Sequence, residues 1–239
     1  MKSHKTFCTL ITPFFNEEED IENFLETCVK YVKNNDFITR IILIDDGSND
    51  TSRKKVKMFL LRNKDFSNIF DLIVNQRNIG WQKSFQESIQ RTKTEYLMTV
   101  PVGSVDINTF LVRPEEENDI VIYERLNLYT RGKLREILSV FFRFIITIFF
   151  HTGFVDTNAP ILIKTNKLKN MNFFSKSFFF QVEIVVKFFL NKYSFKKKKV
   201  KLQTTKSKKS QSLNYQQLNL VIFDFFKLLK YYIIYKIKF

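Results

Sequence analysis

The sequence predicts an α/β fold in which a mostly parallel sheet is flanked by helices. Short β-branched runs alternate with segments of helical spacing through the first hundred residues, which is the pattern of βαβ units. Turn residues gather directly after the predicted strands, where the loops of such a sheet lie. The composition, with 44% hydrophobic and 26% charged residues, is that of a globular protein, which excludes disordered, collagen-like and disulfide-stapled classes.

The first half of the chain contains strands and helices in strict alternation. Thr6 to Thr12 is an apolar run that stops at Pro13, whose missing N–H suits a strand end. Asn16 to Asp20 supplies a cap and an acidic first turn for a helix whose apolar residues recur at helical spacing through Val32. The elements expected next are a strand at 40–44, a helix at 56–62, a strand at 71–74, a turn at 75–80, a helix at 82–92 and a strand at 96–100.

The second half is less regular. We expect a strand at 119–123 and a short one near Ile161. Around them lie a basic and aromatic stretch at 124–150, a Phe-rich stretch at 173–190, a lysine run at 196–199 and an apolar helix at 218–237. Parallel strands bring their carboxyl ends to one edge of the sheet, where open sheets of this kind bind ligands. The acidic turn at 45–50 falls at that edge.

The positive charge of the chain is concentrated at its carboxyl end. The net charge is +15, and twelve Lys against one Asp between Tyr193 and Phe239 account for +11 of it. Anionic lipid, nucleic acid and water all suit such a segment. Lysines beside an amphipathic aromatic helix favour lipid headgroups, whereas no recognition-helix, zinc or RNP-like pattern supports nucleic acid. We therefore expect an anionic membrane surface as a partner and no nucleic acid.

Two apolar segments, 137–150 and 218–235, are rich in Phe, Ile and Leu. Arg143 interrupts the first, and Asp224 with two lysines interrupts the second, so neither is a simple membrane span of about 20 apolar residues. A helix that lies in a membrane interface has this composition. Buried core helices are the alternative interpretation.

The cysteines and the N-terminus bear on the compartment. Cys8 and Cys28 are isolated and have no metal-site spacing, and they provide no disulfide framework. The first eleven residues are too short and too polar for a secretory signal. We expect a cytoplasmic protein that is peripheral on the inner face of the cell membrane.

Three motifs follow the first three predicted strands in order. They are Pro13-Phe14-Phe15-Asn16-Glu17, Asp45-Asp46-Gly47-Ser48 and Asn75 to Gly80. Together they resemble the inverting family 2 glycosyltransferases, whose GT-A fold is Rossmann-like. Later features resemble the polyprenyl-phosphate branch of that family, which is dolichyl-phosphate mannosyltransferase-like. These features are Tyr123-Glu124-Arg125, Arg131, Arg135, Ser139, Val155-Asp156-Thr157, Lys164, Gln181-Val182-Glu183 and the basic stretch 206–212.

The resemblance covers about residues 6–215. It implies a GT-A domain at 1–215, and we expect 216–239 to be a basic amphipathic helix at the membrane surface. It also implies a nucleotide-sugar donor, whose base N–H and ribose hydroxyls suit carboxylate acceptors such as Glu17 and Asp45 or Asp46. The donor-site residues implied are Pro13, Phe15, Asn16, Glu17, Asp45, Asp46, Gly47, Ser48, Asn78 and Gly80.

The metal motif of the family is missing. The family holds Mg²⁺ or Mn²⁺ with an Asp-x-Asp motif after the fourth strand, where the cation neutralises the leaving diphosphate. Here Val or Pro stands where the carboxylates are expected, and the first acid is Asp106. Three explanations stay open: Asp106 and substrate phosphates hold the metal weakly, Arg and Lys replace it, or the transfer activity has been lost while the fold remains.

The acceptor side of the predicted site rests on arginines. A lipid phosphate is already an anion, so it needs positioning cations rather than a general base. Arg125, Arg131 and Arg135 are the catalytic candidates, with solvated helix charges as the alternative. Glu183 would orient the acceptor or deprotonate a hydroxyl acceptor. The alternative for Glu183 is a helix-face carboxylate paired to Lys187, four residues on.

Two functions from different classes follow. The first is transfer of a sugar from a nucleotide sugar to a lipid-linked phosphate or a growing glycan. The second is a catalytically silent GT-A domain that binds a nucleotide sugar or a partner at the membrane, which the missing Asp-x-Asp motif favours.

Overall fold

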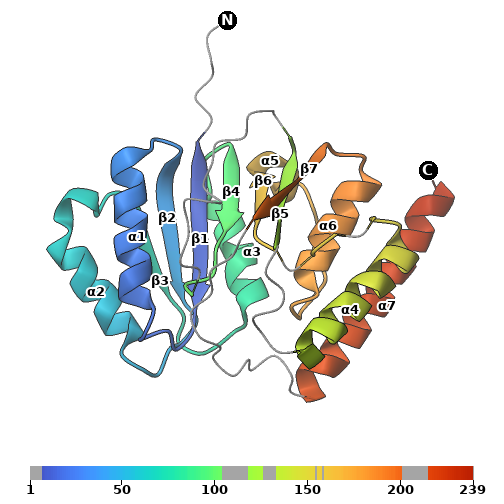
Figure 1. Cartoon of the computed structure of the whole chain (residues 1–239), viewed down its shortest axis with the longest axis horizontal. Helices are drawn as coiled ribbons and strands as arrows, with labels where there is room; N and C mark the ends of the chain where they lie inside the picture. Colours follow the sequence, from blue (N-terminus) through green and yellow to red (C-terminus); the bar gives the residue numbers. More distant parts are fainter. Residues whose placement is uncertain are drawn as a thin grey trace, which may run out of the picture.

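The sheet at the centre of the computed structural model is mixed, with its strands in the order β3-β2-β1-β4-β6-β5-β7 (Figure 1). The structure describes residues 7–103, 118–125, 133–153, 155–157, 159–200 and 215–238. Within them the strands are β1 (Cys8–Phe14), β2 (Ile38–Asp45), β3 (Phe70–Val74), β4 (Tyr96–Thr99), β5 (Ile120–Arg125), β6 (Ile161–Lys164) and β7 (Phe195–Val200). The helices are α1 (Ile21–Asn34), α2 (Ser52–Arg62), α3 (Trp81–Arg91), α4 (Lys133–Phe150), α5 (Thr165–Lys169), α6 (Phe180–Leu190) and α7 (Tyr215–Lys238), with a 3₁₀ turn at Lys64–Phe66.

The strand directions decide where loops meet. β3, β2, β1 and β4 pair in parallel, so their carboxyl ends share one edge. β6 is antiparallel to both β4 and β5, and β7 is parallel to β5. Since β4 and β5 are both antiparallel to β6, β5 points the same way as β4 and ends at the same edge. The predicted α/β fold with a mostly parallel sheet is confirmed.

Helices cover both faces of the sheet because successive strand residues face opposite sides. Leu10 of β1 belongs to a buried cluster that includes Phe24 of α1. Its neighbour Ile11 belongs to a second cluster, with Phe85 of α3 and Ile184 of α6. Both clusters are almost fully buried, and they hold helices against both faces of the sheet.

The lysine run corrects one expectation. Lys196 to Lys199 form most of β7, an edge strand paired with β5, rather than part of a loose basic tail. All four lysines are exposed, while Val200 is buried. Charged side chains on an edge strand discourage pairing with another chain.

α4 and α7 lie side by side at the end of the molecule next to α6 (Figure 1). Ile146 of α4, Val186 of α6 and Leu228 of α7 share a third buried cluster. Phe150 contacts Tyr232 edge to face, with ring centres 5.5 Å apart, so α7 packs on the body of the fold. Among the described residues no helix combines the length and the apolar composition needed to cross a membrane.

Candidate functional site

The first and second motifs are hydrogen-bonded to each other at the carboxyl ends of β1 and β2. The N–H of Asn16 donates to Ser48 Oγ at 3.0 Å, and Asn16 Oδ1 accepts the N–H of Asn49 at 2.9 Å. The N–H of Asp46 donates to the carbonyl of Phe14 at 2.9 Å. Asn16 has a φ of 55°, a left-handed conformation that Asn adopts more readily than most residues. The two loops therefore form one surface.

The start of α2 secures the same loop from the other side. The N–H of Glu17 donates to Ser52 Oγ at 2.8 Å, and that of Glu18 donates to Asp50 Oδ2 at 3.1 Å. The Glu18 carboxylate accepts the hydroxyl of Thr51 at 2.7 Å and its N–H at 3.1 Å. These two hydrogen bonds lower the pKa of Glu18, because both stabilise the charged form.

Asp46 joins the second motif to the third. Its Oδ1 accepts hydrogen bonds from Asn75 Nδ2 at 2.9 Å, the N–H of Ile79 at 3.0 Å and the hydroxyl of Ser84 at 3.1 Å. Its Oδ2 accepts the N–H of Gly80 at 2.9 Å. Asp46 is 4% exposed, and these four hydrogen bonds hold the 75–80 turn in place. Its contact with a nucleoside stays a prediction.

Asp45 is buried behind an arginine. Its side chain is fully inaccessible and accepts the N–H of Ser48 at 2.8 Å and a hydrogen bond from Arg53 Nε. Arg53 is 35% exposed, so Arg53 is the group that this pair presents to solvent. The sequence reasoning missed it, although a basic residue in the first turn after an acidic loop is a usable signal.

Gly47 explains why the motif needs glycine. Its φ is +77°, and a Cβ there would lie 2.4 Å from the carbonyl carbon of Arg77 and 2.6 Å from the nitrogen of Asn78. Only a hydrogen atom fits between the second and third motifs. The predicted donor-site residues that come together at this edge are Pro13, Phe15, Asn16, Glu17, Asp45, Asp46, Gly47, Ser48, Asn78 and Gly80.

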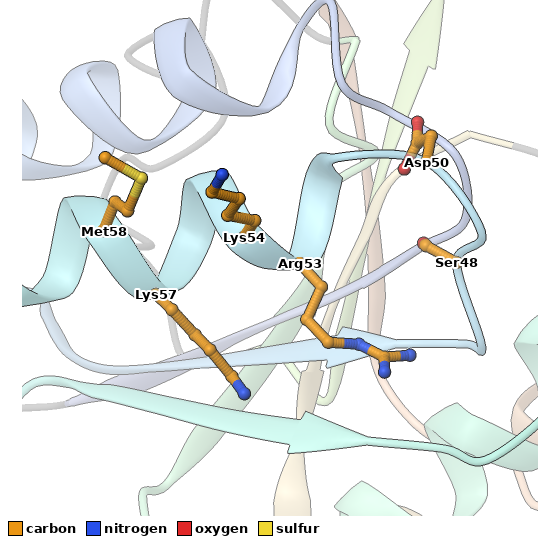
Figure 2. A pocket seen from close by; sticks show the side chains of 6 residues that line it. All are labelled: Ser48, Asp50, Arg53, Lys54, Lys57 and Met58. Atoms are coloured by element: carbon orange, nitrogen blue, oxygen red, sulfur yellow. The ribbon is translucent and has the colours of Figure 1, made fainter.

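A shallow hollow of about 410 Å³ flanks this edge (Figure 2). Figure 2 shows Arg53 and Lys57 extending from the same side of α2, with Ser48 and Asp50 on the preceding loop. Lys54 and Met58 complete the lining. Two lysines and an arginine attract an anion, and the planar guanidinium suits phosphate oxygens.

The acceptor-side candidates are only partly placed. Arg125 is the last residue of β5 and so lies at the edge where β1 to β4 end. Arg135 belongs to the first turn of α4. Arg131 and Asp106 lie outside the described residues.

Glu183 is a core residue. It is 0% exposed, and its Oε1 lies 2.5 Å from Lys187 Nζ. Its carboxylate also accepts the N–H groups of Phe174 at 3.2 Å and Ser175 at 2.9 Å. The pairing with Lys187 that helical spacing suggested is confirmed. This geometry corrects the assignment of Glu183 as a catalytic base, because a buried carboxylate with these partners positions the 172–175 segment instead.

The residues at the end of β4 do not fit a divalent cation. Thr99 to Gly103 place no carboxylate there. Across the described ranges, no group of three His, Cys, Asp or Glu side chains could hold a metal ion, whereas Mg²⁺ and Mn²⁺ prefer oxygen ligands, chiefly carboxylates. We therefore derive no step through a metal ion.

Comparison with protein families agrees with this geometry. Residues 9–100 match the family described as glycosyl transferase family 2. A dolichyl-phosphate beta-glucosyltransferase of Trichomonas vaginalis is 25% identical over 191 residues, which cover 72% of this chain and 57% of that protein. An undecaprenyl-phosphate 4-deoxy-4-formamido-L-arabinose transferase of Proteus mirabilis is 26% identical over 123 residues, 50% of this chain and 37% of that protein. The chain thus spans about half the length, or less, of these curated relatives.

Solved structures show the fold. The mannosyltransferase PcManGT from Pyrobaculum calidifontis, in complex with GDP-Man and Mn²⁺, superposes with a TM-score of 0.66 at 13% identity, covering 95% of this chain and 65% of that one. Glucosyl-3-phosphoglycerate synthase from Mycobacterium tuberculosis, in complex with Mn²⁺, UDP-glucose and phosphoglyceric acid, gives 0.69 at 11% identity, covering 94% and 80%. The chain has the GT-A fold, and its residues 9–100 match glycosyl transferase family 2.

Proposed function

We propose that this chain transfers a sugar, with inversion, from a nucleotide sugar to a lipid-linked phosphate at a membrane surface. The observation that carries the proposal is the interlocked edge at which Asp46 ties the second motif to Gly80 of the third. That edge lies inside the segment that matches the family. The names of both curated relatives, a dolichyl-phosphate and an undecaprenyl-phosphate transferase, support a polyprenyl-phosphate acceptor.

The donor would bind over the loops after β1 and β2. Phe15, Asn16 and Glu17 are half-buried on this surface and offer an aromatic ring and polar groups to the base and ribose. Arg53 and Lys57 in the adjoining hollow would neutralise the diphosphate. Asp45 would act through Arg53, by orienting its guanidinium.

The reaction needs no proton acceptor. A phosphate oxygen of the acceptor attacks the anomeric carbon, the bond from that carbon to the diphosphate oxygen breaks, and the nucleoside diphosphate leaves with the electron pair. The acceptor phosphate would be positioned by Arg125, Arg131 and Arg135. Their positive charge would also offset the repulsion between that phosphate and the donor diphosphate. Glu183 would keep its partner loop in place from inside the core.

A second candidate function rests on one specific observation. The described end of β4 carries no carboxylate, so a GT-A domain that binds a nucleotide sugar without transferring it is the alternative. A weak metal site that includes Asp106 would favour the transferase over this silent domain.

Location at the inner face of the cell membrane forms part of the proposal. A polyprenyl phosphate is confined to a membrane, so a protein that uses it must work at the surface. The two cysteines are buried and form no disulfide bond. We expect this of a protein on the cytoplasmic side, where thiols are kept reduced.

A transfer assay tests the proposal. The full chain would be incubated with radiolabelled UDP-, GDP- or dTDP-sugars and polyprenyl phosphate in vesicles, and label would be counted in the lipid extract. We expect one donor to yield an acid-labile lipid product, and Arg125→Met to lower kcat/KM by about a hundredfold. Arg62→Met, an exposed arginine at the end of α2, serves as the control. A donor that binds without any transfer would favour the silent domain.

A further inference from the structure

α4 and α7 both present apolar side chains to solvent. On α4, Phe141 is 59% and Phe144 is 55% exposed. On α7, Phe223 is 57% and Phe226 is 61% exposed. The other exposed large apolar residues of the two helices are Ile137, Leu138, Val140, Ile148, Phe149, Leu218, Ile222, Ile233, Ile234 and Ile237. Scattered apolar residues are normal on a protein surface, but a set of this size on two neighbouring helices marks an interaction site.

The two apolar faces are continuous. Phe149 of α4 contacts Phe225 of α7 edge to face, with ring centres 5.3 Å apart. Phe225 in turn contacts the exposed Phe226 at 5.5 Å. The helices lie next to each other (Figure 1), so the exposed residues form one surface, which we call the α4/α7 face.

One of the charges that interrupt each segment in the sequence is turned inward. Arg143 of α4 is 8% exposed, so no ionisable side chain is exposed between residues 137 and 150. Asp224 of α7 is 1% exposed. Its Oδ2 accepts the N–H groups of Lys176 and Ser177, both at 2.9 Å, and the hydroxyl of Ser177 at 2.7 Å.

What remains outside on α7 is positive. Lys227, Lys230, Lys236 and Lys238 are exposed, and between residues 218 and 238 the sole acid is the buried Asp224. Lys227 Nζ lies 4.9 Å from the centre of the Phe223 ring, so cationic and apolar groups are interleaved.

We propose that the α4/α7 face docks on an anionic lipid bilayer, with its aromatic and aliphatic side chains among the upper acyl chains and its lysines at the headgroups. Apolar groups bordered by lysines match the boundary between acyl chains and anionic headgroups. A second copy of the chain matches it less well, because the same face of that copy exposes no acid between residues 218 and 238 to pair with the lysines. The inference deepens the membrane-surface part of the proposed function and rests on it only for the lipid nature of the acceptor.

The orientation of the helices gives the docked face a role in the reaction. Both first turns lie at the end of the molecule toward which β1 to β4 point (Figure 1). A bilayer along the α4/α7 face would therefore approach the edge that ends in Arg125. An acceptor phosphate at the headgroup level would reach the donor site without leaving the membrane.

Sedimentation with vesicles tests the inference without any nucleotide. The full chain would be mixed with phosphatidylcholine vesicles that contain or lack phosphatidylglycerol. Phe141→Gln and Phe226→Gln would each lower the partition coefficient by about tenfold, and the pair by about a hundredfold. Added salt would weaken binding. Leu61→Gln, at a side chain 68% exposed on α2, is the matched control and would leave binding unchanged.

Several outcomes would overturn the inference. They are a wild-type chain that binds neither vesicle, a double variant that binds like the wild type, and a control that loses as much binding as the double variant. A dimer in vesicle-free solution that the double variant abolishes would assign the face to a second copy. Nucleotide-sugar titration of the double variant keeps the two proposals apart, since its donor affinity should equal that of the wild type.

Discussion

The Oδ2 atom of Asp46, at the end of β2, accepts the backbone N–H of Gly80 at 2.9 Å, 34 positions further along the chain. Gly80 directly precedes α3 and has a φ of +92°. This contact fixes the turn after β3 against the turn after β2. The candidate donor site is therefore built on a buried carboxylate that holds two of its loops together.

Replacing Asp46 by Asn should destabilise the fold and weaken donor binding together. One oxygen becomes an N–H₂ group, which must face either the N–H of Gly80 or the three donors on Oδ1, and leaving buried donors unsatisfied costs about 1–3 kcal/mol each. We expect the free energy of unfolding in urea to fall by about 2–4 kcal/mol.

Asp71→Asn provides the matched control for that substitution. Asp71 lies in β3, but its side chain is 42% exposed and pairs with Arg40. A half-exposed pair of this kind contributes about 1 kcal/mol or less. Equal losses in the free energy of unfolding would show that the hydrogen bonds of Asp46 stabilise the fold no more than the half-exposed pair of Asp71 with Arg40.

Gly47→Ala should be far more costly than Gly153→Ala. Both glycines have positive φ, but a Cβ at Gly47 would meet the backbone of Arg77, whereas a Cβ at Gly153 would meet nothing within 4 Å. Positive φ alone costs about 1–2 kcal/mol for alanine, and the clash adds about 1–3 kcal/mol of overpacking at Gly47. Thermal unfolding of both variants measures the difference, and equal melting temperatures would rule out the close approach.

Both thiols should resist alkylation until the chain unfolds. Burial raises the pKa of Cys8 and of Cys28 above the ordinary value of 9.0, because desolvation disfavours the thiolate. The raised pKa stabilises the fold below pH 9.0, and that stabilisation is lost as the pH rises and the unfolded thiols ionise. Mass spectrometry after treatment with iodoacetamide at pH 8 should find neither cysteine alkylated in buffer and both alkylated in denaturant. Rapid native labelling would contradict the placement of both residues in the core.

Asp224→Ala should loosen α7. The substitution leaves the N–H groups of Lys176 and Ser177 and the hydroxyl of Ser177 without their acceptor, and we expect a loss of about 2–3 kcal/mol for these buried donors. Limited trypsin digestion should then cut at Lys227 and Lys230, which lie within the helix. Lys230→Gln with Asp224 intact is a control for the loss of one cleavage site. Unchanged protection in Asp224→Ala would show that apolar packing alone holds α7.

Local patterns in the sequence account for most of the fold. The apolar run of β1 and the helical spacing of α1 predicted their positions to within a few residues. β7 was missed because four successive lysines show no apolar alternation. It is a strand because its backbone pairs with β5, and that pairing is a tertiary effect.

The same limit applies to the candidate site. The motif Asp45-Asp46-Gly47-Ser48 locates the edge, and helical spacing alone suggested the pair of Glu183 with Lys187. The sequence does not reveal that Arg53 covers Asp45. That arrangement depends on how α2 packs against the sheet. The residue types indicated where the candidate site lies. The role of each carboxylate depends on its hydrogen-bond and ion-pair partners, which the sequence does not show.

Calorimetric titration with UDP-, GDP- and dTDP-sugars, each with Mn²⁺, with Mg²⁺ and with chelator, tests the central claim most directly. We expect one donor class to bind with one site per chain, and to bind in chelator as well, because Arg53 and Lys57 neutralise the diphosphate. Binding that requires metal would assign a ligand role to Asp106. A chain that binds none of these sugars under any of the three conditions would contradict the proposed donor site.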